Sequence, residues 1–157
     1  MRLKQATYRH IESEIYSYYI TLQTIQKLRN DIIFGNNQDI GSFSGIGKKH
    51  AVTRDTEDRV MRLVGLRISE MERITNAIRD VYNRIKPEEI KKTIWLKYDL
   101  ALNWNPPPEL KVLVGGETNR FTIPMDKMLT LLNLDRATFF EHCNGFVYGI
   151  AQQLGWY

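Results

Sequence analysis

Two stretches of apolar residues at alternating steps of three and four constrain the fold of this 157-residue chain most strongly. The first stretch runs from about Thr7 to Ile33, and its stripe consists of Tyr8, Ile11, Ile15, Tyr18, Leu22 and Ile25. The second runs from about Asp55 to Ile85, and its stripe consists of Val60, Val64, Met71, Ile74, Ile78, Val81 and Ile85. Arg29 and Arg67 each interrupt one stripe. This spacing is typical of helices that pack along a seam. We therefore expect two long helices that form a hairpin or a coiled-coil-like pair.

A glycine-rich segment, residues 34–53, separates the two expected helices. Its composition favours a flexible linker. The stretch Gly45-Ile46-Gly47-Lys48-Lys49 lacks the glycine spacing and the hydroxyl residue of a phosphate-binding loop, so we expect no nucleotide site there. The first part of the chain therefore divides into a helix over 1–33, a linker over 34–53 and a helix over 54–86.

Residues 87–157 predict a separate, smaller module. Pro87 before two glutamates favours a helix start, and Asn105 before a run of three prolines favours its end. The apolar side of this helix would consist of Ile90, Ile94, Trp95, Tyr98 and Leu102. The stretches Leu110–Val114 and Arg120–Ile123, joined through Gly115-Gly116, predict a short β-hairpin. The expected fold class is mainly α, with this hairpin as an insertion.

The last thirty-three residues predict a helix-turn-helix. Met125–Asn133 carries apolar residues at helical spacing, and Leu134-Asp135 interrupts the pattern. Asp135 is a suitable N-cap for a second helix over Arg136–Leu154. In DNA-binding proteins with this motif, the first helix braces the second, whose N-terminal end enters the major groove.

Few residues are suited to catalysis or metal binding. The single cysteine, Cys143, excludes an internal disulfide, and the three histidines show no ligand spacing. We expect a non-enzyme without a metal or cofactor. The chain has no apolar run long enough for a membrane span and no apolar signal core at its N-terminus. We therefore expect a cytoplasmic protein that does not bind a membrane.

The positive charge of the chain lies in its middle. Residues 48–98 hold thirteen basic and eight acidic residues, which gives +5, whereas residues 99–157 hold four basic and six acidic residues, which gives −2. The net charge of the whole chain is +4. The helix-turn-helix is therefore less basic than the segment before it.

Several blocks of the sequence resemble the RinA/ArpU-type phage transcriptional activators. Tyr8–Glu14 leading to Leu28–Ile32 looks like the opening helix of that family, and Arg73–Asn83 looks like its second helix. Ile94–Tyr98 is similar to the family's helix before the reader, and Phe146–Trp156 is similar to its ending. The resemblance covers most of the chain in blocks.

The resemblance implies a sigma-like helix-turn-helix that binds a promoter, activates late phage genes and engages host RNA polymerase. The base-reading positions would be Arg136, Ala137, Thr138, Phe140 and Glu141. The sequence departs from the family here, since the family places several basic and aromatic residues on this helix. It departs again in the connection over Asn103–Thr122, which is longer than in the family.

Charge placement and the resemblance together indicate which residues would meet double-stranded DNA. Arg136 and Thr138 would position the reader. Phosphate contacts would come from Lys48, Lys49, Arg54, Lys91, Lys92 and Lys127. The helical pair would supply a homo-oligomer, with a dimer favoured.

Two other functions fit the same pattern. A phage small terminase subunit also combines a DNA-binding module with oligomerising helices, and a closed ring of chains would distinguish it. A protein-interaction adaptor would have a degenerate helix-turn-helix, as the charge of −2 over residues 99–157 suggests. Its DNA affinity would be lost at moderate salt.

Overall fold

The computed structural model describes residues 2–33, 54–114 and 123–157, and every regular element in these ranges is a helix. The chain forms two compact units. Unit 1 consists of Met1–Tyr18 and Asn76–Tyr157, and unit 2 consists of Tyr19–Thr75. Both ends of the chain belong to unit 1, and the stretch between them forms unit 2.

The N-terminal region forms two helices where the sequence predicted one. These are α1 (Gln5–Tyr16) and α2 (Tyr18–Ile33), and Ser17 between them has φ −91° and ψ 4°. The single stripe of the sequence serves two separate packing surfaces. Ile11 and Ile15 are buried within unit 1, whereas Ile25 is buried within unit 2. The prediction of one continuous helix was therefore wrong at Ser17.

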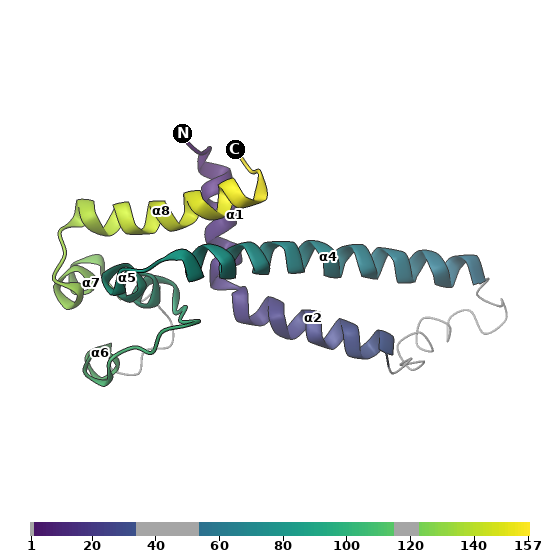
Figure 1. Cartoon of the computed structure of the whole chain (residues 1–157), viewed down its shortest axis with the longest axis horizontal. Coiled ribbons are helices and arrows are strands. Elements are labelled where there is room, and N and C mark those ends of the chain that lie inside the picture. The colour runs from purple at the N-terminus through teal and green to yellow at the C-terminus, as the bar shows by residue number, and fades with distance from the viewer. Residues whose placement is uncertain (1, 34–53, 115–122) are drawn as a thin grey trace. The chain divides into compact units, whose positions relative to one another are not determined.

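The second long helix of the prediction is present as α4 (Arg54–Arg84), drawn in Figure 1. Its C-terminal part belongs to unit 1, where Ile78 and Tyr82 are fully buried. Its earlier part belongs to unit 2 and runs beside α2, in the opposite direction (Figure 1). In unit 2, Arg29 of α2 forms an ion pair with Glu72 of α4.

The region after α4 contains two helices and corrects two predictions. Helix α5 (Glu88–Tyr98) begins after Pro87, as predicted, but ends at Asp99, whose φ of 56° is left-handed. The helix therefore stops before Leu102, well before the prolines predicted to end it. Asp is among the residues that tolerate this conformation.

The predicted β-hairpin is wrong, because its first strand is helix α6 (Pro108–Val114). Leu110 and Val114 are buried, while Val112 between them is 77% exposed. A burial interval of four residues fits a helix, whereas a strand would bury every second residue. Pro108 occupies the first helical turn, where a proline is favoured. The turn and most of the predicted second strand lie outside the described residues.

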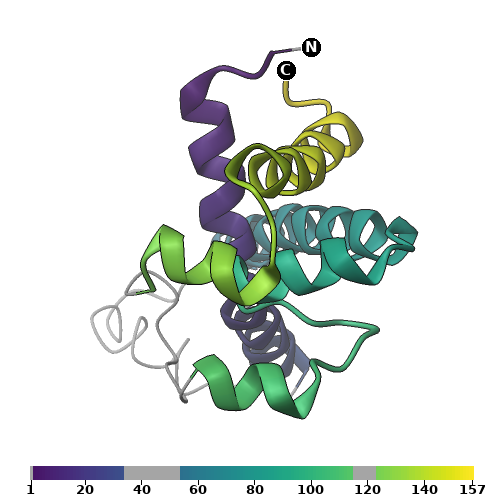
Figure 2. The same ribbon diagram turned by 90° about the vertical axis from the view of Figure 1, so that its left-hand side faces the viewer.

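The core of unit 1 is built around the last helix, α8 (Arg136–Leu154), which follows α7 (Met125–Leu132). Helix α8 packs against α1 and α5, and α5 also packs against α7 (Figures 1 and 2). The buried side of α8 consists of Phe139, Cys143, Phe146, Val147, Ile150, Ala151 and Leu154. On the side towards α4, Gly149 lets the two backbones approach, since an added Cβ would lie 2.9 Å from Cγ1 of Val81.

Candidate nucleic-acid interface

Two helices, α7 and α8, and a tight turn between them occupy the segment predicted to be a helix-turn-helix. Asn133 ends α7 with a left-handed φ of 54°. Its N–H donates to the carbonyl of Thr130 at 3.2 Å, and the N–H of Leu134 donates to the carbonyl of Leu129 at 3.1 Å. This pair of hydrogen bonds is a Schellman motif, which satisfies carbonyls at the helix end and reverses the chain direction. The turn therefore has a defined backbone geometry.

The N-terminal end of α8 combines a firm anchor with an exposed side. Phe139 is fully buried and holds the first turns of α8 in the core. Arg136, Ala137 and Glu141 are exposed, and Phe140 is half-buried. Thr138, the remaining position implied to read bases, is also half-buried. A rigid helix end with an exposed side is what insertion into a groove requires.

Two local contacts order the side chains at this helix end. The guanidinium of Arg136 lies 5.6 Å from the centroid of the Phe140 ring, a cation–π geometry. The hydroxyl of Thr138 beside Asp135 lowers the pKa of that carboxyl below its ordinary value. Arg136 and Thr138 thus each have a partner close to the start of α8.

The basic residues predicted to contact phosphate differ in their exposure and in their contacts within the protein. Lys127 is exposed on α7, and Lys92 is half-buried on α5. Lys91 is engaged within the protein: its ammonium donates to Oδ1 of Asn103 at 2.7 Å and lies 5.6 Å from the centroid of the Tyr82 ring. Lys127 and Lys92 are consequently better placed than Lys91 to meet a phosphate.

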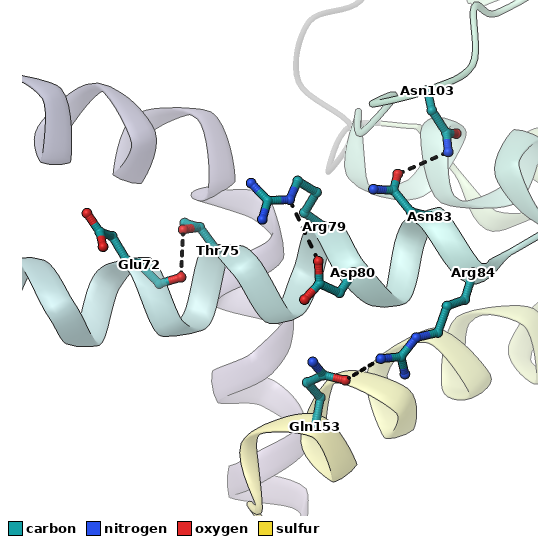
Figure 3. A network of polar contacts seen from close by, with 8 residues as sticks. All are labelled: Glu72, Thr75, Arg79, Asp80, Asn83, Arg84, Asn103 and Gln153. Atoms are coloured by element: carbon teal, nitrogen blue, oxygen red, sulfur yellow. Dashed lines mark hydrogen bonds and ion pairs between the residues drawn. The ribbon is translucent and has the colours of Figure 1, made fainter.

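A chain of hydrogen bonds links Lys91 through Asn103 to Asn83 on α4. The amide of Asn103 that accepts from Lys91 also donates to Oδ1 of Asn83 at 3.0 Å (Figure 3). On the same helix, the guanidinium of Arg84 donates to Oε1 of Gln153 at 2.9 Å, which links α4 to the C-terminal part of α8 (Figure 3). These contacts hold Arg84 of α4 against α8 and Lys91 of α5 against the segment that follows α5.

The remaining predicted phosphate contacts lie either outside the described residues or in unit 2. Lys48 and Lys49 lie outside the described residues, and Arg54 is the first residue of α4, with a side chain outside the described part. Arg54 also belongs to unit 2, whereas the other described candidates belong to unit 1. The structure thus brings together Arg136, Thr138, Lys127, Lys91 and Lys92 in one unit.

The exposed side of α8 is not basic beyond its first turn. Ala137, Glu141 and Gly145 follow each other at intervals of four and are all exposed, and residues at this interval share a helix face. Glu141 can accept a hydrogen bond from cytosine in the major groove. Its negative charge also opposes the approach of phosphates, so basic side chains outside this face would have to supply most of the attraction.

No sequence pattern predicted the cluster of polar contacts that joins α1 to α5 and α8. Oε1 of Glu12 on α1 accepts hydrogen bonds from the Tyr98 hydroxyl at 2.6 Å and the Lys97 ammonium at 3.0 Å, both on α5. The hydroxyl of Tyr8 donates to Oδ1 of Asn144 on α8 at 2.7 Å. These contacts tie α1 to α5 and α8. The only indication of this cluster in the sequence is that Tyr8 and Glu12 lie four residues apart.

Burial changes the acidity of this cluster. It raises the pKa of Tyr98 and of Tyr8 well above the ordinary value of 10.0, and the pKa of Tyr16 to about 12. It also raises the pKa of the Cys143 thiol to about 11. The thiol is therefore protonated near neutral pH, and a buried protonated thiol is a poor nucleophile. This group acts as a core residue.

Among the residues that the structure describes, no group of three or more His, Cys, Asp or Glu side chains could hold a metal ion. Within the same ranges, no helix has both the length and the apolar character that crossing a membrane requires.

Comparisons with known proteins found nothing similar to this chain: no family model, no curated protein and no solved structure matches it.

Proposed function

We propose that this chain is a double-stranded DNA-binding transcriptional regulator of the phage activator type. The observation that carries the proposal is the arrangement of α5, α7 and α8. Helix α8 is anchored by Phe139, its N-terminal end is exposed, and a turn of defined geometry at Asn133 connects it to α7. This is the arrangement used by proteins that place a recognition helix in the major groove.

Arg136 is the residue proposed to read a base. It is exposed at the end of α8 that would enter the groove, and its guanidinium is oriented by the Phe140 ring. Arginine pairs with guanine through two hydrogen bonds, and such a pair contributes about 1–3 kcal/mol of discrimination. Lys127 and Lys92 are proposed to contact phosphates, which adds affinity at every sequence.

The test begins with binding of fragments from the source genome, selected and sequenced at physiological salt. Recovery of one or two discrete sites supports the proposal, and diffuse recovery contradicts it. On a recovered site, Arg136→Ala should weaken binding and relax preference at one position. Lys127→Ala should weaken binding equally at all sequences and reduce the salt slope by about 1. Lys111→Ala is the matched control, because Lys111 is exposed on α6 and carries the same charge.

The finer parts of the proposal concern assembly and partners. We propose that α2 and the first part of α4 act as a paired helical element that makes the regulator a dimer, and that host RNA polymerase is its protein partner. Sedimentation of the full chain tests the first part: a dimer supports it, whereas a large closed ring would favour the small terminase subunit instead.

One observation favours a second function, a protein-interaction adaptor. The exposed side of α8 carries Glu141 between two small residues, Ala137 and Gly145. Such a face suits contact with another protein at least as well as contact with phosphates. Glu141→Gln separates the two functions, because it should change the affinity of a DNA reader for its recovered site several-fold and leave an adaptor's weak, salt-sensitive DNA binding almost unchanged.

A further inference from the structure

Within unit 2, helix α4 carries a covered apolar stripe and, on another side, an exposed stripe with two leucines at its centre. The covered stripe is Val64, Ile68, Met71 and Thr75, of which Ile68 is 8% and Thr75 is 3% exposed. Leu63 and Leu66 belong to the other stripe and are 66% and 67% exposed. At 100° per residue, the centres of the two stripes lie about 140° apart on the helix. The second stripe therefore faces away from the side that is buried within the unit.

The exposed stripe reads the same in both directions. Its four members are Arg59, Leu63, Leu66 and Glu70, spaced by four, three and four residues. When two copies of such a helix pack antiparallel about a two-fold axis, Leu63 of one copy lies opposite Leu66 of the other. Arg59 then lies opposite Glu70 at each end. The stripe is thus complementary to itself in the spacing of its residues and in their charges, as a two-fold interface requires.

We propose that this stripe is the contact by which a second copy of the chain docks, with the two α4 helices antiparallel. A two-fold contact buries the four leucines of the pair together and places an Arg59–Glu70 ion pair on either side. Glu70 already accepts from Arg73 at 3.1 Å on the same helix, and both side chains are about half exposed. An exposed pair of this kind is weak and can be extended to a second arginine.

Alternating steps of four and three are the spacing of a packing seam. This spacing recurs here on a face of α4 where the two central leucines are mostly exposed. Large exposed apolar patches on soluble proteins mark interaction sites. The contact needs no DNA, so its failure would leave the proposed function of α8 untouched.

The test is the dissociation constant of the full chain without DNA, measured by sedimentation equilibrium. Leu63→Gln and Leu66→Gln should each raise it at least tenfold. Leu113→Gln is the matched control, because Leu113 on α6 is 57% exposed and should leave the constant unchanged. A chain that stays monomeric at all concentrations, or a control that weakens the dimer as strongly, overturns the proposal.

A charge exchange tests the pairing across the interface. Arg59→Glu and Glu70→Arg should each raise the dissociation constant several-fold, and the double variant should recover most of the loss. Glu70→Gln with wild-type Arg59 shows how much of the loss comes from Glu70 alone. If the double variant is no better than the weaker single variant, Arg59 does not face Glu70 of a second copy.

Crosslinking tests the direction of the helices. A bismaleimide of about 8 Å, close to the separation of packed helix axes, should join an Arg59→Cys chain to a Glu70→Cys chain in a mixture. Each variant alone should crosslink poorly, because residue 59 of one antiparallel copy lies about 16 Å along the axis from residue 59 of the other. The buried Cys143 is replaced by alanine in both chains. Efficient crosslinking of either variant with itself would indicate parallel helices and overturn the proposal.

Discussion

The close approach of α8 to α4 gives a prediction about two glycines that differ only in their surroundings. Gly145 and Gly149 lie four residues apart on α8. A Cβ at Gly145 would meet no atom within 4 Å, whereas a Cβ at Gly149 would lie 2.9 Å from Cγ1 of Val81. The same substitution, glycine to alanine, should therefore have opposite effects at the two positions.

The magnitudes follow from two terms. Replacing a helical glycine by alanine stabilises a protein by roughly 0.5–1 kcal/mol, because the unfolded chain loses freedom. Gly145→Ala should show this gain alone. At Gly149 the added methyl overpacks the contact, at a cost of about 1–3 kcal/mol. Val81 cannot move aside easily, since it is 8% exposed and its branched side chain has few rotamers. Gly149→Ala should thus lower the free energy of unfolding by about 1 kcal/mol.

Urea unfolding of the full chain, followed by far-ultraviolet circular dichroism, measures both effects. Val81→Ala supplies the internal check, because it removes the atom that the methyl would meet. In that background Gly149→Ala should become stabilising, so the two substitutions should be coupled by at least about 1 kcal/mol. The reasoning is refuted if Gly149→Ala stabilises the wild-type chain as much as Gly145→Ala does.

Three further predictions concern the turn and the polar cluster. Asn133→Ala should destabilise by about 1 kcal/mol, because alanine resists the left-handed φ of 54°, while Asn133→Gly should be nearly neutral in the same urea assay. Glu12→Gln should cost roughly 1–3 kcal/mol, since it leaves the Lys97 ammonium without its carboxylate; an unchanged midpoint would show that this contact contributes nothing. The pKa of Cys143 is raised from 9.0 to about 11, so the unfolded chain loses this proton first and stability should fall as the pH rises from 9 to 11. Cys143→Ala should reduce that fall, and an identical pH profile would contradict it.

The helical elements were predictable wherever periodicity was long and local signals agreed. Helix α4 and the pair α7 and α8 follow directly from the spacing of their apolar residues. The break at Ser17 was not predictable, because the stripe continues through it and only the division between two units separates Ile15 from Ile25. A continuous apolar stripe in the sequence does not show whether its residues will pack into one core or into two.

The two errors after α5 have local causes. Asp99 ends the helix with a left-handed conformation that the sequence permits without requiring. The run Leu110–Val114 is short and apolar, and such runs fit a strand or a helix equally well. Pro108 was the signal that could have decided it, since proline is favoured in a first helical turn.

The candidate interface was predictable only in part. Sequence spacing placed Arg136 at the start of α8 and Lys127 on α7. The engagement of Lys91 by Asn103 and Tyr82 depends on contacts across the fold, which no local pattern contains. The cluster of Glu12 with Tyr98 has the same origin, because 86 residues separate the two side chains in the chain.

The most direct test of DNA reading by α8 is the affinity of the chain for DNA fragments of its source genome, compared between wild type and Arg136→Ala at physiological salt. We expect one or two discrete sites for the wild type. We also expect a roughly 5–150-fold loss at those sites for Arg136→Ala, the equivalent of about 1–3 kcal/mol, with little change on unrelated DNA. Equal binding of wild type and variant to all fragments would contradict a DNA-reading role for α8.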